Sequence, residues 1–125
     1  MKNISILVPE SSVMQATADP QYLFSAVNQF SNMKGHPPAF QIRLVGIHKV
    51  VSLNNGTFSV KTDIQLDDPI VSDLVIIPAL FGDLEQAVEV NSMMVPWIKN
   101  QYERGAEIAS LCVGAFLLAA TGLLD

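Results

Sequence analysis

The chain has 125 residues, enough for one domain with a substantial hydrophobic core and too few for two. Half of the residues are hydrophobic and 15% are charged, which indicates a globular chain with much buried sheet rather than a disordered one. Seven basic and 12 acidic residues give a formal net charge of −5, which argues against this segment binding the phosphates of a nucleic acid.

The sequence also argues against a membrane-spanning or secreted protein. The longest apolar stretch, around residues 115–120, is far shorter than the roughly 20 residues that span a bilayer. The opening MKNISILVPE carries no small-residue cleavage site and predicts a first strand rather than a signal peptide. Cys112 is the only cysteine, so no intrachain disulfide can form, and we expect a cytoplasmic protein.

The first 45 residues predict a strand, a helix and a second strand. The β-branched run 4–8, ended by Pro9, is typical of a strand covered on both faces. Asp19-Pro20 is a good helix start, because Asp accepts free amides and proline needs no acceptor there. The strand 40–45 follows a Gly-Pro-Pro loop. The predicted helix places four apolar residues on one face, where they should pack on the sheet: Leu23, Phe24, Val27 and Phe30.

The middle of the chain predicts an antiparallel hairpin followed by a buried strand. Asn55-Gly56 supplies the positive φ angles of a tight turn, with apolar or β-branched residues on both sides. We expect this hairpin to extend from the main sheet. The run 73–78 is the next buried strand.

The last third predicts a helix, a strand and a second helix. Asn91 or Ser92 should cap the first helix, which Gly105 closes and which carries Met93, Met94, Trp97, Ile98 and Tyr102. A strand over 107–111 and a helix over 114–121 follow. The alternation predicts an α/β fold with a mostly parallel sheet flanked by helices. Because the series stops after a helix, leaving a sheet edge uncovered, we expect the chain to be the first part of a longer domain.

A sharp bend, here called the elbow, is predicted between the strand 107–111 and the following helix. In a parallel sheet, ligands bind beyond the carboxyl ends of the strands, where Cys112 lies. Small residues such as Gly114 let the chain turn so that the thiol points over the sheet. The amides of Val113 and Gly114 would favour a thiolate or bind an oxyanion. The alternative is that Cys112 is only a small buried hydrophobic residue.

Two other loops should reach the same edge of the sheet. Glu10 follows the first strand and could bind a polar ligand or share a proton with the thiol, or be a solvated loop carboxylate. In PALFGD, the amides of Ala79 and Leu80 would line the crevice, with Gly82 allowing close approach. Asp83 could cap the next helix or reach a ligand.

This pattern of strands and loops places neither histidine where it could serve as a catalytic base for Cys112. His36 lies in the Gly-Pro-Pro loop and His48 near the start of the hairpin, so each is expected to be a surface or loop residue. With one cysteine and no close histidine pair, a metal site is not expected, and no cofactor is indicated.

The motifs SDLVIIPALFGD, a strand-Cys-x-Gly-Ala elbow and LLAATGLLD resemble the ThiJ/PfpI superfamily, whose fold is flavodoxin-like and class I glutamine amidotransferase-like. Within that superfamily, residues 72–125 and the hairpin are similar to the ligand-sensing half of AraC-family transcriptional regulators. The resemblance implies a homodimeric sensing domain over residues 1–125 that binds a small-molecule effector. It implies that a helix-turn-helix domain beyond residue 125 binds DNA.

The resemblance carries over to individual positions only in part. Cys112 matches the elbow cysteine, with the Val113 and Gly114 amides in the place of the oxyanion hole. Glu10 matches the acid that superfamily enzymes place beside the thiol. Ala79-Leu80 stands where many of these enzymes have a glycine pair, and the superfamily's catalytic histidine would lie beyond Asp125.

Two alternatives to a sensing domain stay open. The chain could belong to an enzyme of the superfamily, such as an isonitrile hydratase, an amidase or a glyoxalase-like hydrolase. Cys112 would then be the nucleophile and Glu10 would assist it. Alternatively, a lowered thiol pKa would make Cys112 an oxidation sensor.

Overall fold

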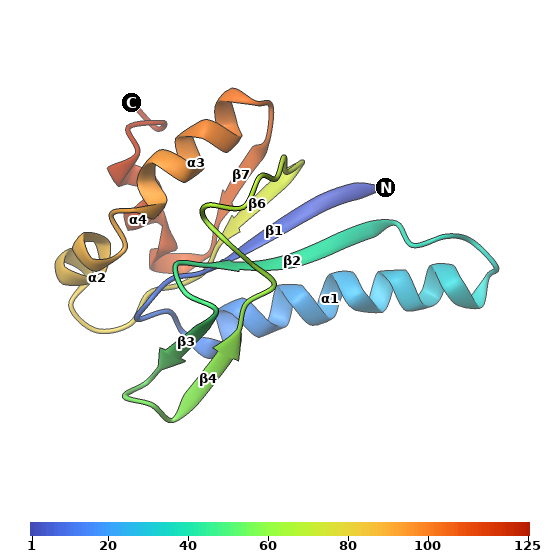
Figure 1. The fold of residues 1–125 in the computed structure, drawn as a ribbon, viewed down its shortest axis with the longest axis horizontal. Coiled ribbons are helices and arrows are strands. Elements are labelled where there is room, and N and C mark those ends of the chain that lie inside the picture. The colour runs from blue at the N-terminus through green and yellow to red at the C-terminus, as the bar shows by residue number, and fades with distance from the viewer.

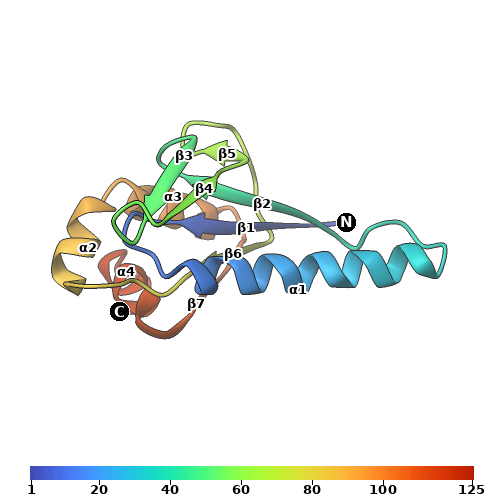
Figure 2. The ribbon, with the colours of Figure 1, turned by 90° about the horizontal axis from the view of Figure 1, so that it is seen from below.

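The chain folds around one parallel sheet, described for residues 1–125 by a computed structural model (Figures 1 and 2). The strands lie in the order β5-β2-β1-β6-β7, and each neighbouring pair is parallel. Their bounds are β1 Lys2–Val8, β2 Phe40–Gly46, β5 Ile64–Gln65, β6 Leu74–Ile77 and β7 Glu107–Ser110. The predicted fold class is therefore confirmed; the short strand β5 was not predicted.

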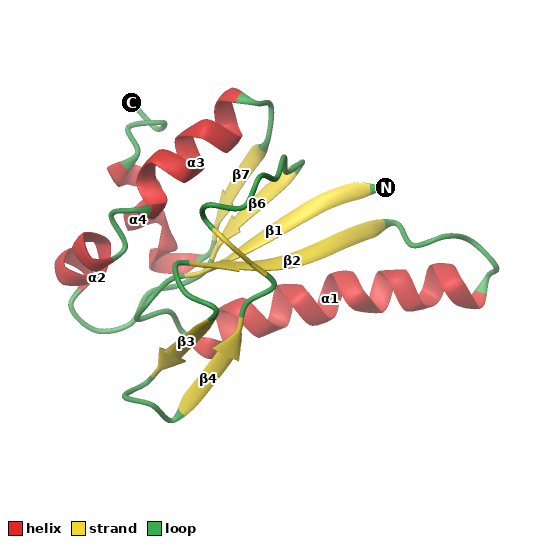
Figure 3. Cartoon of the chain, viewed as in Figure 1, coloured by secondary structure: helices red, strands yellow, loops and turns green.

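Helices cover both faces of the sheet, as the colouring in Figure 3 makes plain. One face is covered by α1 (Met14–Met33). The other carries α2 (Leu84–Val90), α3 (Met94–Glu103) and α4 (Ala115–Ala120), which a 3-10 turn, η1 (Cys112–Gly114), precedes. The predicted helices after Asp83, near Asn91 and after the elbow are all present.

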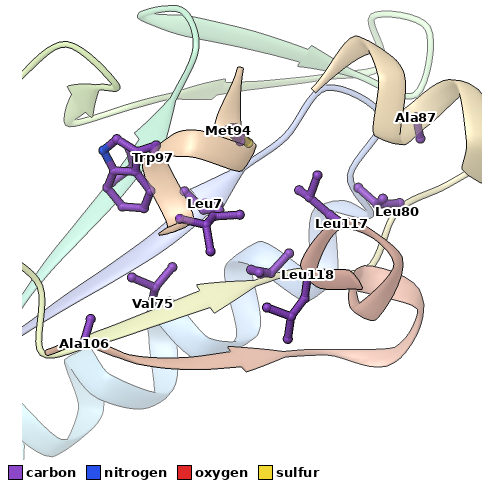
Figure 4. Close-up of a cluster of buried hydrophobic side chains, with 12 residues drawn as sticks. Leu7, Val75, Leu80, Ala87, Met94, Trp97, Ala106, Leu117 and Leu118 are labelled. Atoms are coloured by element: carbon purple, nitrogen blue, oxygen red, sulfur yellow. The ribbon is translucent and has the colours of Figure 1, made fainter. Parts of the chain in front are cut away.

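Alternation along the strands explains the two halves of the core. Ile4 and Ile6 of β1 pack with Phe24 on the α1 side, whereas Leu7 belongs to the larger cluster beneath α3 and α4. That cluster includes Met94, Trp97, Ile98, Leu117 and Leu118 (Figure 4). Because β1 is covered on both faces, it reads as a continuous apolar run rather than an alternating one.

The predicted start of the first helix is wrong. The helix begins at Met14, and Pro20 lies in its interior. The start is set by a contact distant in sequence: the Val13 amide donates to the Ala79 carbonyl at 2.8 Å, which fixes the residue before the helix. The local Asp19-Pro20 signal is overridden by this contact.

The predicted packing face of that helix is also largely wrong. Leu23 and Phe30 are each 63% exposed, and Val27 is exposed as well. The sheet-facing side is instead set by Phe24, whose ring meets that of Phe40 edge-on at 5.0 Å, and by Asn28, whose amide bonds both backbone groups of Phe40. A polar anchor therefore decides how the helix is rotated, and an apolar stripe is left outside.

The hairpin is confirmed, but as a separate unit. It comprises β3 (Val50–Leu53) and β4 (Phe58–Lys61), which pair only with each other. Asn54, Asn55 and Gly56 all have positive φ in the connecting turn. The hairpin does not continue the main sheet as we expected; Val51, Leu53 and Val60 pack instead against Val8 at the end of β1. Figures 1 and 3 show it standing apart from the five strands.

The predicted cap of α3 is wrong as well. The N-cap position is Met93, which gives no side-chain cap, and the Asn91 side chain points elsewhere. By contrast, Asp83 does cap α2, accepting from the Gln86 amide at 3.2 Å. Gly105 has the positive φ predicted after its helix, and Gly122, which follows α4, has a positive φ as well.

Candidate functional site

The elbow has the strained backbone that the sequence predicts. Cys112 has φ +50°, a value that side-chain-bearing residues rarely adopt, and it lies between β7 and α4. Its side chain is exposed rather than packed in the core. The Leu111 amide donates to the Ile77 carbonyl at 2.9 Å, so the chain is held to β6 until one residue before the bend. Strain held in this way by the surroundings is frequent at functional sites.

Gly114 is what makes the bend fit. A Cβ at this position would lie 2.7 Å from the Ile77 carbonyl oxygen and closer still to that of Pro78. Only glycine therefore lets η1 pass so close to the end of β6. Val113 is half-buried and packs against the main core, so its side chain faces inward.

The loops after β1 and β6 are joined to one another. Ser12 and Leu80 form an antiparallel bridge, in which the Phe81 amide donates to the Ser11 carbonyl at 2.6 Å. Ala79 and Leu80 are buried, yet neither amide has a hydrogen-bond acceptor in the structure. Position 82 favours glycine because its φ is +85°. Close approach, which we expected, is not the reason, since a Cβ at this position would have no atom within 4 Å.

Glu10 is held in place by a residue that sequence reasoning assigned to another role. The Asn91 side chain is fully buried and grips the Glu10 backbone: its Oδ1 accepts from the Glu10 amide at 2.8 Å, and its Nδ2 donates to the Glu10 carbonyl at 2.7 Å. The same Nδ2 donates to the Ala87 carbonyl at 2.7 Å. Asn91 thus ties the end of β1 to the α2–α3 junction. A buried asparagine read from sequence alone is easily mistaken for a helix cap.

His48 is also closer to the site than expected. It is exposed, as predicted, but its Nε2 lies 3.6 Å from Oε1 of Glu10. The hairpin brings it there, because only Lys49 separates His48 from the start of β3. His36 lies exposed in its loop, as predicted.

A large cavity lies between the hairpin and the loop after β1. It measures about 900 Å³ and is lined by residues 10–15 and 52–56, Phe58 and Phe81. Among the predicted site residues, Glu10 alone lines it. Cys112, which we expected to face a cavity, does not border this one. The hairpin residues of the wall were missed because nothing in a local pattern indicates that a hairpin will fold over a distant loop.

The structure therefore gathers the predicted residues at one edge of the sheet but in two places. The sheet order β1-β6-β7 puts Glu10, Ala79, Leu80 and the elbow at the carboxyl ends of adjacent strands. No group of three or more His, Cys, Asp or Glu side chains is arranged to hold a metal ion. The helices include none with the length and apolar character needed to cross a bilayer.

With this geometry, the chain has the fold of DJ-1/ThiJ/PfpI proteins. A proposed transcriptional regulator from Vibrio parahaemolyticus superposes with a TM-score of 0.79 at 19% identity over 98% of this chain. A DJ-1 superfamily protein from Agrobacterium tumefaciens superposes with a TM-score of 0.70 at 22% identity over the whole chain. A two-domain protein from Anabaena variabilis with DJ-1/ThiJ/PfpI-like and ferritin-like domains gives 0.74 at 18% identity over 98% of it.

These similarities concern the fold, since all the identities are low. The chain spans 62%, 61% and 33% of the three neighbours' own lengths, respectively. No protein-family model matches the sequence, and no curated protein is significantly similar to it.

Proposed function

We propose that this chain is the small-molecule-sensing domain of a transcriptional regulator of the AraC type, with the effector bound at the carboxyl edge of the sheet beside Cys112. The observation that carries the proposal is the elbow itself, which presents an exposed thiol on a strained backbone at the carboxyl edge of the sheet. Ligands of open parallel sheets bind at this edge, and strained residues are frequent at functional sites.

Two further features support this role. The net charge of −5 suits a domain that leaves DNA binding to a separate module. The exposed apolar stripe of α1, which includes Leu23, Phe30 and Met33, suits a surface that a second copy covers in a homodimer. The effector then shifts the dimer between arrangements through its differential affinity for them.

The test uses the complete reading frame. Full-length protein should bind DNA from its own upstream region at physiological salt, whereas residues 1–125 alone should not. Cys112→Ala should leave DNA binding by the full-length protein intact. If the complete protein carries no DNA-binding activity, the regulator assignment fails.

A second candidate is an enzyme of the superfamily, with Cys112 as nucleophile and Glu10 assisting. The amides of Ala79 and Leu80, which donate to no acceptor in the structure and follow the strand next to β7, favour it, because unpaired donors can hold a developing oxyanion. Hydrolysis of amides, isonitriles or glyoxals that disappears in Cys112→Ala would establish this role.

A further inference from the structure

The cavity beneath the hairpin has the composition of a binding site in its own right. Its volume of about 900 Å³ falls within the usual range for small-molecule sites. One wall is the loop after β1, which the Asn91 clamp and the Ser12–Leu80 bridge hold rigidly. The other wall is the hairpin, which is docked by side-chain packing and pairs with no strand of the main sheet. The loop wall is fixed by hydrogen bonds, whereas no strand pairing ties the hairpin wall to the main sheet. This arrangement suits a site that closes on its ligand.

The polar residues of the lining are almost all neutral hydrogen-bonding groups. Six of the lining residues carry hydroxyl or amide side chains: Ser11, Ser12, Gln15, Ser52, Asn54 and Asn55. Glu10 is the only ionisable residue among them, and His48 already lies against its carboxylate. No lysine or arginine lines the cavity, so a phosphate or carboxylate would find no counter-charge there.

One of these polar groups has no partner within the protein. Ser12 is 4% exposed, and its Oγ is buried without a hydrogen bond. A buried hydroxyl left unpaired is costly unless something else supplies the partner. Ser12 belongs to the cavity wall, so a ligand on which the wall closes can supply the partner that the covered hydroxyl lacks in the free protein.

The wall also presents apolar surface where a ligand would need it. Phe58 on the hairpin and Phe81 on the opposite loop are 45% and 65% exposed. Exposed aromatic rings beside a polar cavity are typical of sites that bind a ligand with one apolar face. A sugar ring has this character, because its C–H groups form an apolar face while its hydroxyls project around the edge.

We propose that this cavity binds a neutral, hydroxyl-rich small molecule of the monosaccharide or polyol class. Its hydroxyls meet Ser12, Ser52 and the hairpin asparagines, and its C–H face packs on Phe58 and Phe81. The ligand does not touch Cys112. This is a second site, distinct from the effector site proposed beside Cys112, and binding to it does not depend on the sensing role. Binding is tested without DNA.

The experiment measures binding by titration calorimetry and thermal shift with a panel of neutral monosaccharides, disaccharides and linear polyols. The matched sugar phosphates, uronic acids and primary amines are run beside them. We expect at least one neutral compound to bind, and its phosphorylated or carboxylated counterpart to bind at least about tenfold more weakly. If no compound in the panel binds, or if only anions or amines do, the proposal is wrong.

Two variants, each with a matched control, locate the site. Ser12→Ala removes only a hydroxyl that has no partner in the free protein, so the free energy of unfolding should not fall, while affinity falls by about fivefold or more. Thr17→Val is its control, since the Thr17 hydroxyl is also buried and unpartnered but lies outside the cavity wall. Phe81→Ala should likewise weaken binding, and Phe116→Ala, equally a loss of an exposed ring but on α4, should not.

The outcomes separate this proposal from the one above. A sugar that binds equally well to Ser12→Ala and Phe81→Ala overturns the cavity assignment, whatever the full-length protein does with DNA. A sugar that binds in the cavity of a protein with no DNA-binding activity supports the cavity and rejects the regulator. Cys112→Ala should leave sugar binding unchanged; loss of binding in that variant would place the ligand at the elbow instead.

Discussion

The elbow and the hairpin cavity lie at the same end of the sheet but are held in different ways. At the elbow, adjacent residues fix the backbone: Cys112 has positive φ, and Gly114 leaves no room for a Cβ against the end of β6. The cavity instead has walls more than 35 residues apart in sequence, joined by the packing of Val51, Leu53 and Val60 on Val8. The elbow is therefore held by its own backbone conformation. The shape of the cavity depends instead on a small apolar contact between the hairpin and the end of β1.

The largest loss of stability should come from a substitution at the elbow. Gly114→Ala places a methyl group against the carbonyls of Ile77 and Pro78, which are backbone atoms that cannot move aside cheaply. We expect the free energy of unfolding to fall by about 3 kcal/mol or more, measured by urea denaturation. Gly35→Ala is the control, since a Cβ there meets nothing and only the positive φ costs about 1–2 kcal/mol. Equal losses in the two variants would mean that the elbow is not tightly packed.

The hairpin should respond locally rather than globally. Leu53→Ala removes the fully buried leucine of the hairpin cluster, and large-to-small changes of this kind cost about 2–4 kcal/mol. Because β3 and β4 pair only with each other, amide exchange should accelerate first over residues 50–61, before it does in β1. Val50→Ala on the exposed side of the same strand should cost less than about 1 kcal/mol. Uniform acceleration across the main sheet would show that the hairpin is not a separate unit.

The same difference explains what could be predicted from sequence. The strands β1, β2, β6 and β7, the turn at Asn55-Gly56 and the bend at Cys112 are each encoded by a few neighbouring residues, and all are present. The start of α1 depends on the Val13–Ala79 hydrogen bond, which joins residues far apart in the chain. No local pattern contains that information.

The candidate site was predicted only in part for the same reason. Glu10 and Cys112 follow strands, so their place at the edge of the sheet follows from topology. Asn91 and the hairpin wall reach the site through tertiary contacts. The rotation of α1 about its axis is likewise decided by the hydrogen bonds of Asn28 to Phe40. The apolar stripe of the helix had predicted that a different face would pack on the sheet.

Asn91 joins the cavity wall to the helices above the core, because it holds the backbone of Glu10, which lines the cavity, against the α2–α3 junction. Asn91→Ala leaves the amide and carbonyl of Glu10 without their partners, and we expect a loss of about 2 kcal/mol in unfolding free energy. Asn100→Ala, on the exposed side of α3, should stay within about 0.5 kcal/mol of the parent. Asn91→Asp keeps the acceptor but loses the donor, so an Asp variant as stable as the parent would show that the bonds to the Glu10 and Ala87 carbonyls contribute nothing.

The smallest predicted change in unfolding free energy is a gain rather than a loss. Cys112→Gly relieves a φ of +50° that glycine adopts freely, while it also increases the entropy of the unfolded chain. Because relief of a left-handed conformation contributes about 1–2 kcal/mol and the entropy opposes it by about 0.4–1, we expect a net gain of about 0.5 kcal/mol. Ala119→Gly, in the exposed part of α4, should instead lose about 1 kcal/mol, since glycine is unfavourable within a helix. A Cys112→Gly variant that loses as much as Ala119→Gly would mean that the thiol makes contacts worth more than the strain, and that the elbow is held by its side chain rather than by its backbone.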